Sequence, residues 1–205
     1  MESTGVYWKP VMRVLEADIP NVWIVNTRHI KNVPGHKTDK MDSEWICKLL
    51  LAGLLKPSYI PPKEQRQLRD LTCYRNKLIQ TMETEKNRMM RVLEDCNIKL
   101  SSVVANTSGV TATALIVMLC EGRKLTMADI ESVYHKKLSA SPQGLLEACT
   151  GFVEEHHIYM LQMIRKSIAQ TQDLVDELSK RIKDMLIKYD NVLELLKEIP
   201  VLTPR

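Results

Sequence analysis

Glycine, proline and phenylalanine are scarce in this sequence, which has 7, 9 and 1 of them among 205 residues. Leu, Ile, Met, Lys and Glu dominate instead, and this composition indicates a globular, helix-rich chain. The five cysteines are scattered, and no two of them form a C-x-x-C pair. Their spacing argues against a zinc site and against a disulfide framework, and it favours a reducing, cytoplasmic location.

Long apolar runs are missing as well. The longest one, ALIVMLC at 114–120, is far shorter than the roughly 18 residues of a membrane span, so no membrane contact is expected. The N-terminus carries Glu2 and lacks the apolar core of a secretion signal. The net charge of +4 permits a nucleic-acid partner without requiring one.

The first 62 residues combine helix and strand patterns. Apolar positions predict a helix over 5–17, and the β-rich stretch NVWIVN predicts a short strand over 21–26. A basic loop follows, and a second helix is expected from Thr38 to about Leu55, before the helix-breaking stretch KPSYIPP. We therefore expect 1–62 to form part of an α/β domain with too few strands to close a sheet.

The rest of the chain is predicted to be mainly α. Residues 63–142 are expected to form one long helix, from 63 to about 100, and a helical connector. The connector contains a Ser-Gly loop, a short apolar helix near 111–121 and a polar helix near 126–137. Residues 201–205 form a short tail.

Residues 143–200 hold the most regular apolar pattern. Its three-four spacing lasts for about five heptads and predicts a coiled coil, although an amphipathic helix of a bundle would show the same pattern. The partner is either the helix at 63–100, packed antiparallel, or the same helix of a second subunit, so a homo-oligomer is expected. The predicted core positions are Leu161, Ile164, Ile168, Thr171, Val175, Leu178, Ile182, Met185, Tyr189, Val192 and Leu196.

The segment VPGHKTDKMDSEW at 33–45 places Asp39 and Asp42 three positions apart. In one interpretation, Thr38 or Asp39 caps a helix whose first turn favours acidic residues because of the helix dipole. In the other, the two carboxylates share one helix face and bind a hard divalent cation such as Mg²⁺, with Glu2 as a third ligand. The residue pattern alone leaves both interpretations open.

Basic residues lie next to these carboxylates. An ordinary solvated loop would explain them. Cations beside a carboxylate cluster are also what a phosphodiester substrate requires, so they are candidate nucleic-acid contacts. They are Arg28, His29, Lys31, His36, Lys37 and Lys40.

Four stretches, taken in order, resemble one known family. They read MESTGVYWKPV at 1–11, NTRHIKNVPGHKTDKMDSEWICKLLLAGLLKPSYIPP at 26–62, LRDLTCYRNKL at 68–78 and NRMMRVLEDCNIKLSSVV at 87–104. In this order and spacing they resemble the DEDD-type transposases of insertion sequences, the family of RNA-guided (bridge-RNA) recombinases. The resemblance extends from residue 1 to about residue 200.

This resemblance implies a RuvC-like domain of the RNase H fold, a coiled coil and a C-terminal domain with a catalytic serine. It implies DNA transposition by recombination, with DNA as substrate and a guide RNA as partner. Four acidic residues of the family hold Mg²⁺ or Mn²⁺, and by motif Glu2, Asp39 and Asp42 correspond to the last three. The capping and ligand roles are compatible if Thr38 is the cap.

The sequence also departs from the family pattern. The family's first Asp lies on an initial strand before the Glu, and its serine domain follows the Ile-Pro of EIPVLTPR, whereas this sequence begins at the Glu and ends there. His36 stands where an Arg is common. We therefore expect the central part of a transposase, with 1–62 as a partial RuvC-like domain and impaired catalysis. The alternative is a non-catalytic coiled-coil fragment that dimerises or binds nucleic acid.

Overall fold

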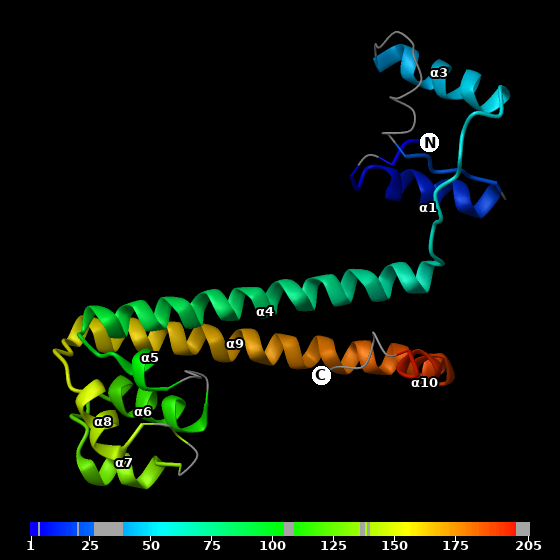
Figure 1. Ribbon diagram of the computed structural model, residues 1–205. Helices are drawn as coiled ribbons and strands as arrows, with labels where there is room; N and C mark the ends of the chain where they lie inside the picture. Colours follow the sequence, from blue (N-terminus) through cyan, green and yellow to red (C-terminus); the bar gives the residue numbers. More distant parts are fainter. Residues whose placement is uncertain are drawn as a thin grey trace. The chain divides into compact units, whose positions relative to one another are not determined.

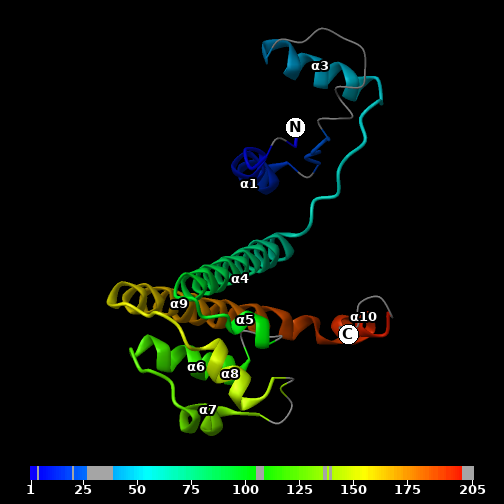
Figure 2. The ribbon, with the colours of Figure 1, turned by 60° about the vertical axis from the view of Figure 1, so that its left-hand side comes forward.

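The computed structural model describes residues 1–3, 5–19, 21–26, 39–104, 109–135, 138 and 140–199, and of residues 39–42 it describes the backbone alone. The chain divides into two compact units, Met1–Arg66 (unit 1) and Gln67–Arg205 (unit 2). The division falls inside the long helix α4, which runs from Lys63 to Asp95. Within the described residues the secondary structure is almost entirely helical, which confirms the prediction of a mainly α chain (Figures 1 and 2).

Unit 1 contains helices α1 (Trp8–Asp18) and α3 (Asp39–Leu51). Helix α1 begins three residues later than predicted, after a turn in which Gly5 has a φ of 49° that favours glycine. Helix α3 ends earlier than predicted because Gly53 has a φ of 68°. The Gly53 N–H donates to the Leu50 carbonyl and the Leu54 N–H to the Leu49 carbonyl, a Schellman motif that closes the helix.

The predicted strand at 21–26 is not formed as a strand in the described part of unit 1. Val25 instead makes two isolated bridges, a parallel one with Glu2 and an antiparallel one with Pro57. Beside the bridge to Pro57, the Ser58 N–H donates to the Ile24 carbonyl over 2.7 Å. A small core lies beside these bridges and is formed by the buried Val25, Leu49 and Leu55, against which Trp45 and Ile46 pack.

Unit 2 is organised around α4 and the second long helix, α9 (Glu155–Leu186), which run antiparallel (Figures 1 and 2). His157 near the start of α9 contacts Asp95 at the end of α4, with Nε2 and Oδ2 3.2 Å apart. Further along, Arg75 Nε donates to Ser179 Oγ over 2.7 Å. The antiparallel arrangement expected for these two helices is therefore present within one chain.

Four short helices cover one end of the α4–α9 pair (Figure 1). The main core of unit 2 lies among them, and Leu115, Ile130, Leu145 and Leu161 are fully buried there. Cys149 also belongs to this core, and burial raises the pKa of its thiol to about 11. The short helices are α5 (Leu100–Val103), α6 (Val110–Cys120), α7 (Met127–Val133) and α8 (Pro142–Ala148).

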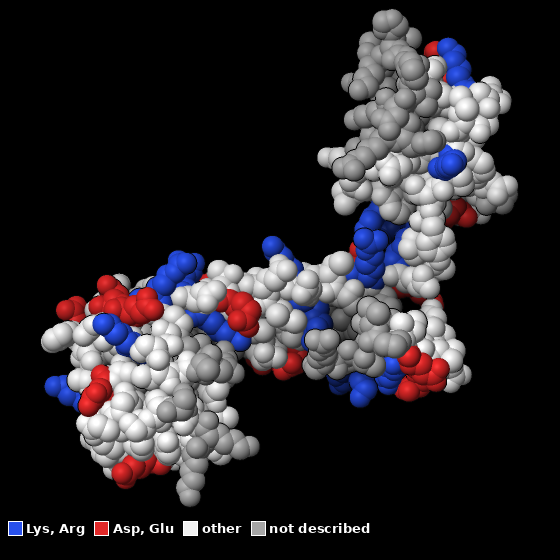
Figure 3. Space-filling view, viewed as in Figure 1, with Lys and Arg blue, Asp and Glu red and all other residues white. Residues whose placement is uncertain are grey.

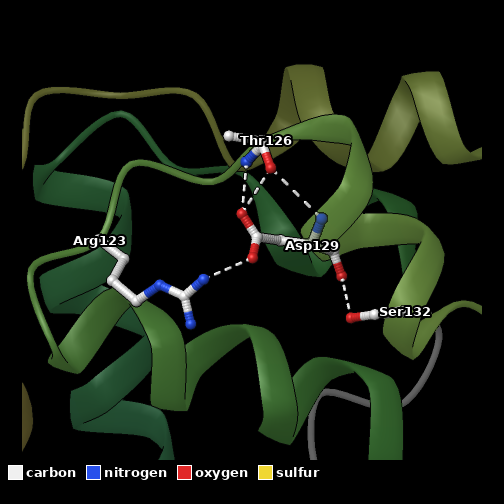
Figure 4. Close-up of polar contacts among 4 residues, drawn as sticks. All are labelled: Arg123, Thr126, Asp129 and Ser132. Carbon is white, nitrogen blue, oxygen red and sulfur yellow. Dashed lines mark hydrogen bonds and ion pairs between the residues drawn. The ribbon is translucent and has the colours of Figure 1, made fainter.

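Polar contacts at helix ends fix the short helices in place. At the start of α7, the Thr126 side chain accepts from the Asp129 N–H while the Asp129 carboxylate accepts from the Thr126 N–H, which forms a capping box. Arg123 adds an ion pair to Asp129 over 2.6 Å (Figure 4). Helix α8, which the sequence analysis did not predict, begins with Pro142 directly after the N-cap Ser141.

The helix predicted from Leu161 onward is interrupted. Helix α9 ends at Leu186, a 3₁₀ turn covers Ile187–Tyr189, and a separate helix α10 spans Asp190–Lys197. The break coincides with Asp190 in the first turn of α10, where a carboxylate favours the positive end of the helix dipole. Consequently the last two predicted core positions lie on α10, where Val192 is 51% and Leu196 is 40% exposed.

Candidate functional site

Glu2 is the one predicted metal ligand whose side chain is described, and it lies at the parallel bridge to Val25. The Val25 N–H donates to the Met1 carbonyl over 2.8 Å, and the Ser3 N–H donates to the Val25 carbonyl over 2.9 Å. These two hydrogen bonds flank Glu2 and fix its backbone against a fully buried residue. The Glu2 side chain remains half-buried, which leaves it accessible to a ligand.

Burial also affects the group next to Glu2. The Met1 amino group donates to the Trp23 carbonyl over 2.9 Å. Burial lowers the pKa of this amino group, and the neighbouring Glu2 carboxylate acts in the opposite direction.

Asp39 and Asp42 both lie on helix α3, with Asp39 as its first residue. Their side chains, like that of Lys40, are outside the described structure, and so are residues Arg28, His29, Lys31, His36 and Lys37 entirely. Among the side chains that are described, no three His, Cys, Asp or Glu residues form a group able to hold a metal ion. That observation does not test the predicted set, because two of its three members are not included.

The C-terminal half of α3 is well defined and connects the motif to the core of unit 1. Leu49 is 3% exposed and packs in the cluster with Val25, the residue that bridges to Glu2. The same buried cluster therefore anchors both the Glu2 segment and the helix that begins at Asp39. The sequence offered no local signal for this pairing, because it joins segments that are more than twenty residues apart.

Two cavities in unit 2 contain few groups that could take part in a reaction. One of about 390 Å³ lies between α4, α9 and α10 and is lined by apolar side chains together with polar ones that include the Arg75–Ser179 contact. Another of about 250 Å³ lies between α4, α6 and α9, with Lys86 and Arg165 at its polar side. Every buried side-chain nitrogen or oxygen in the described residues has a hydrogen-bond partner.

No described helix combines the length and apolar character needed to cross a membrane. No curated protein and no solved structure matches the sequence. A family model does match: it is the DEDD transposase model of the IS110 type, described as "Transposase", and it covers residues 1–98. The matched region contains Glu2, Asp39 and Asp42, all of unit 1 and α4. Residues 1–98 are thus similar to the IS110-type DEDD transposases, and this match supports the function of an insertion-sequence transposase.

Proposed function

We propose that this chain takes part in DNA transposition through a divalent-metal site formed by Glu2, Asp39 and Asp42. The observation that carries the proposal is the match to the DEDD transposase model, which spans all three residues. The order of the residues agrees with the motif, with Glu2 at the start and the two aspartates in the first turn of α3. The same first turn satisfies the helix dipole, so the metal role and the helix-starting role are compatible.

The donor set fits a hard cation. Carboxylate oxygens are the ligands that Mg²⁺ and Mn²⁺ prefer, and the set contains no thiol or imidazole. When bound, such an ion supplies Lewis-acid polarisation of a phosphodiester oxygen and activation of a water molecule. The chain itself holds Glu2 in place through the backbone hydrogen bonds to Val25, and it anchors α3 through Leu49.

The basic residues at positions 28–40 have a separate role in this proposal. They neutralise phosphates of the DNA substrate or of a guide RNA next to the carboxylates. If these basic residues only form a solvated surface, their substitution would leave the affinity for DNA unchanged. The residues concerned are Arg28, Lys31, His36, Lys37 and Lys40.

A second candidate function is a dimerising module, and apolar side chains left exposed on α9 and α10 favour it. Leu174 on α9 is 47% exposed, and Val192 and Leu195 on α10 are 51% and 64% exposed. A second copy could cover these side chains and form a homo-oligomer through the long helices. Sedimentation of Leu174→Asp tests this candidate: a monomeric variant of a dimeric parent supports it, and an unchanged dimer refutes it.

The metal site is tested by unfolding with and without Mg²⁺ or Mn²⁺, followed by tryptophan fluorescence. All three tryptophans, Trp8, Trp23 and Trp45, lie in unit 1, so their emission reports on this unit alone. A ligand at about 100 times its Kd stabilises by ~2.7 kcal/mol, so a clear rise of the midpoint is expected. Asp39→Asn should abolish the metal-dependent rise.

Glu44→Gln is the matched control for this experiment. Glu44 is an exposed residue of the same helix and lies outside the motif. The variant loses one negative charge and should keep the metal-dependent rise in full. Absence of any rise in the parent protein, or an equal loss in both variants, would refute the proposed site.

A further inference from the structure

A second candidate nucleic-acid surface lies in unit 2, on the side of α4 that faces away from α9. Successive residues of an α-helix are about 100° apart, so Arg69, Lys77, Arg88 and Arg91 fall within roughly 100° of one another. The buried residues Met82, Met89 and Leu93 occupy the opposite side of the helix. Figure 3 shows Lys and Arg side chains recurring along this outer edge of α4. We call the four cations the α4 basic stripe.

Most of the stripe is available for a partner. All four cations are exposed. Among the described residues, no hydrogen bond or ion pair involves the side chains of Arg69, Lys77 or Arg91, whereas Arg88 pairs with Glu85 over 3.1 Å. The other acidic residue of the central part of α4, Glu83, is neutralised by Lys86 over 2.7 Å. Two exposed carboxylates, Asp70 and Asp95, also fall within this arc, near its two ends along α4. The arc therefore carries four cations against two carboxylates, which is a local excess of positive charge.

The uncharged residues between these cations suit the same kind of partner. Three exposed amides occupy this face, and amide groups donate to phosphate oxygens just as cations attract them. They are Asn76, Gln80 and Asn87. At 1.5 Å per residue, the distance along α4 from Arg69 to Arg91 is roughly 33 Å, close to one turn of B-form DNA. A row of this length can meet phosphates of both strands where their backbones cross one side of the duplex.

The outer face of α9 provides a direct contrast. Lys166 and Lys180 lie there, opposite the buried Leu161, Ile164 and Val175. Exposed acidic residues are interleaved with these two lysines, so their charges are balanced locally. These acidic residues are Asp173, Glu177 and Asp184.

We propose that the α4 basic stripe binds the phosphate backbone of double-stranded DNA, as a surface separate from the carboxylate motif of unit 1. The choice of DNA as the occupant rests on the proposed transposase function. The binding is independent of sequence and of divalent metal, because it uses cations and amides alone. Its role is to hold the DNA while the carboxylates of unit 1 act on it.

The test measures binding of the full chain to a mixed-sequence DNA duplex of about 20 base pairs, in EDTA, over a range of salt concentrations. The double variant Lys77→Gln/Arg91→Gln removes two unpaired charges of the stripe. We expect weaker binding and a slope of log K against log salt that is smaller by about 1.8, which is ~0.9 for each lost phosphate contact. The matched control Lys166→Gln/Lys180→Gln removes two charges from α9 and should keep the parent slope.

Three results would overturn the proposal. One is a stripe variant, folded by circular dichroism, that keeps the parent's affinity and slope. Another is an equal reduction in the α9 control, which would indicate a general effect of net charge. The third is a loss of binding to duplex RNA with unchanged binding to DNA, which would make RNA the partner. Because the assay contains no divalent metal, its result is distinguishable from a failure of the Asp39→Asn metal test.

Discussion

Unit 1 and unit 2 are held together in different ways. In unit 2 the main cluster contains sixteen buried residues from α4 to α9, and the helix ends carry side-chain caps at α7 and α8. In unit 1 the main described cluster contains three, and short backbone hydrogen bonds join its segments. Large apolar side chains remain exposed in both units, including Leu51 at 84% in unit 1 and Phe152 at 79% in unit 2.

This difference indicates that stability and chemistry are distributed unequally along the chain. The residues that match the transposase motif lie in the unit with the smaller core. The larger core of unit 2 supports long helices whose surfaces are free to contact partners. Because all tryptophans lie in unit 1 and most helical residues lie in unit 2, fluorescence and circular dichroism can follow the two units separately.

The largest expected effect comes from the core of unit 2. Leu161 on α9 is fully buried, and Leu161→Ala should lower the free energy of unfolding by ~2–5 kcal/mol through lost burial and an unfilled cavity. Circular dichroism should record this loss, while the tryptophan transition of unit 1 stays in place. Met163→Ala, on the same helix but 41% exposed, is the control and should change little. An equal shift of both signals in Leu161→Ala would mean that the units unfold as one.

A smaller effect is expected where the backbone of the loop before α9 approaches the end of α4. A Cβ added to Gly151 would clash with the Cys96 carbonyl oxygen and would lie 2.8 Å from Ile98 Cγ1. Gly151→Ala should therefore cost about 1–3 kcal/mol, as expected for overpacking. A Cβ at Gly144, in α8, would meet Ser141 Oγ at 3.4 Å, so Gly144→Ala should be neutral or stabilising. Equal midpoints for the two variants in chemical denaturation would contradict this assignment.

The helices were largely predictable from the sequence, but their ends were less so. The sequence placed α4, α6 and α7 within a few residues, whereas α9 (Glu155–Leu186) is much shorter than the helix predicted over 143–200. The end of α4 depends on Asn97, which adopts a left-handed φ of 60° and is a weaker signal than glycine. Helix α8 was missed because the heptad pattern was extended over it, although Ser141-Pro142 is a helix-start signal.

Both the residues and the geometry of the candidate site stay predictions, although the structure places the backbone of each of the three residues. Glu2, Asp39 and Asp42 were identified from a motif resemblance, and whether they meet at one metal ion stays a prediction. The pairing of Glu2 with Val25 is a long-range contact that no local pattern could indicate. Local sequence could not settle the predicted strand at 21–26 either, because a strand forms only where another backbone segment pairs with it.

The smallest effect concerns the start of α7, where Asp129 accepts from the hydroxyl and the N–H of Thr126 (Figure 4). These hydrogen bonds, with a smaller contribution from Arg123, lower the pKa of Asp129 below its ordinary value of 3.8, and desolvation opposes them only in part. A lowered carboxyl pKa adds stability that is complete above pH 3.8 and disappears as the pH falls through the folded-state value. The unfolding midpoint of the parent, followed by circular dichroism, should therefore exceed that of Asp129→Asn near neutral pH and converge with it in strong acid. Asp173→Asn on α9 serves as a control for net charge. If the difference in unfolding midpoint between the parent and Asp129→Asn persisted undiminished in strong acid, the charge of Asp129 would not be what stabilises α7.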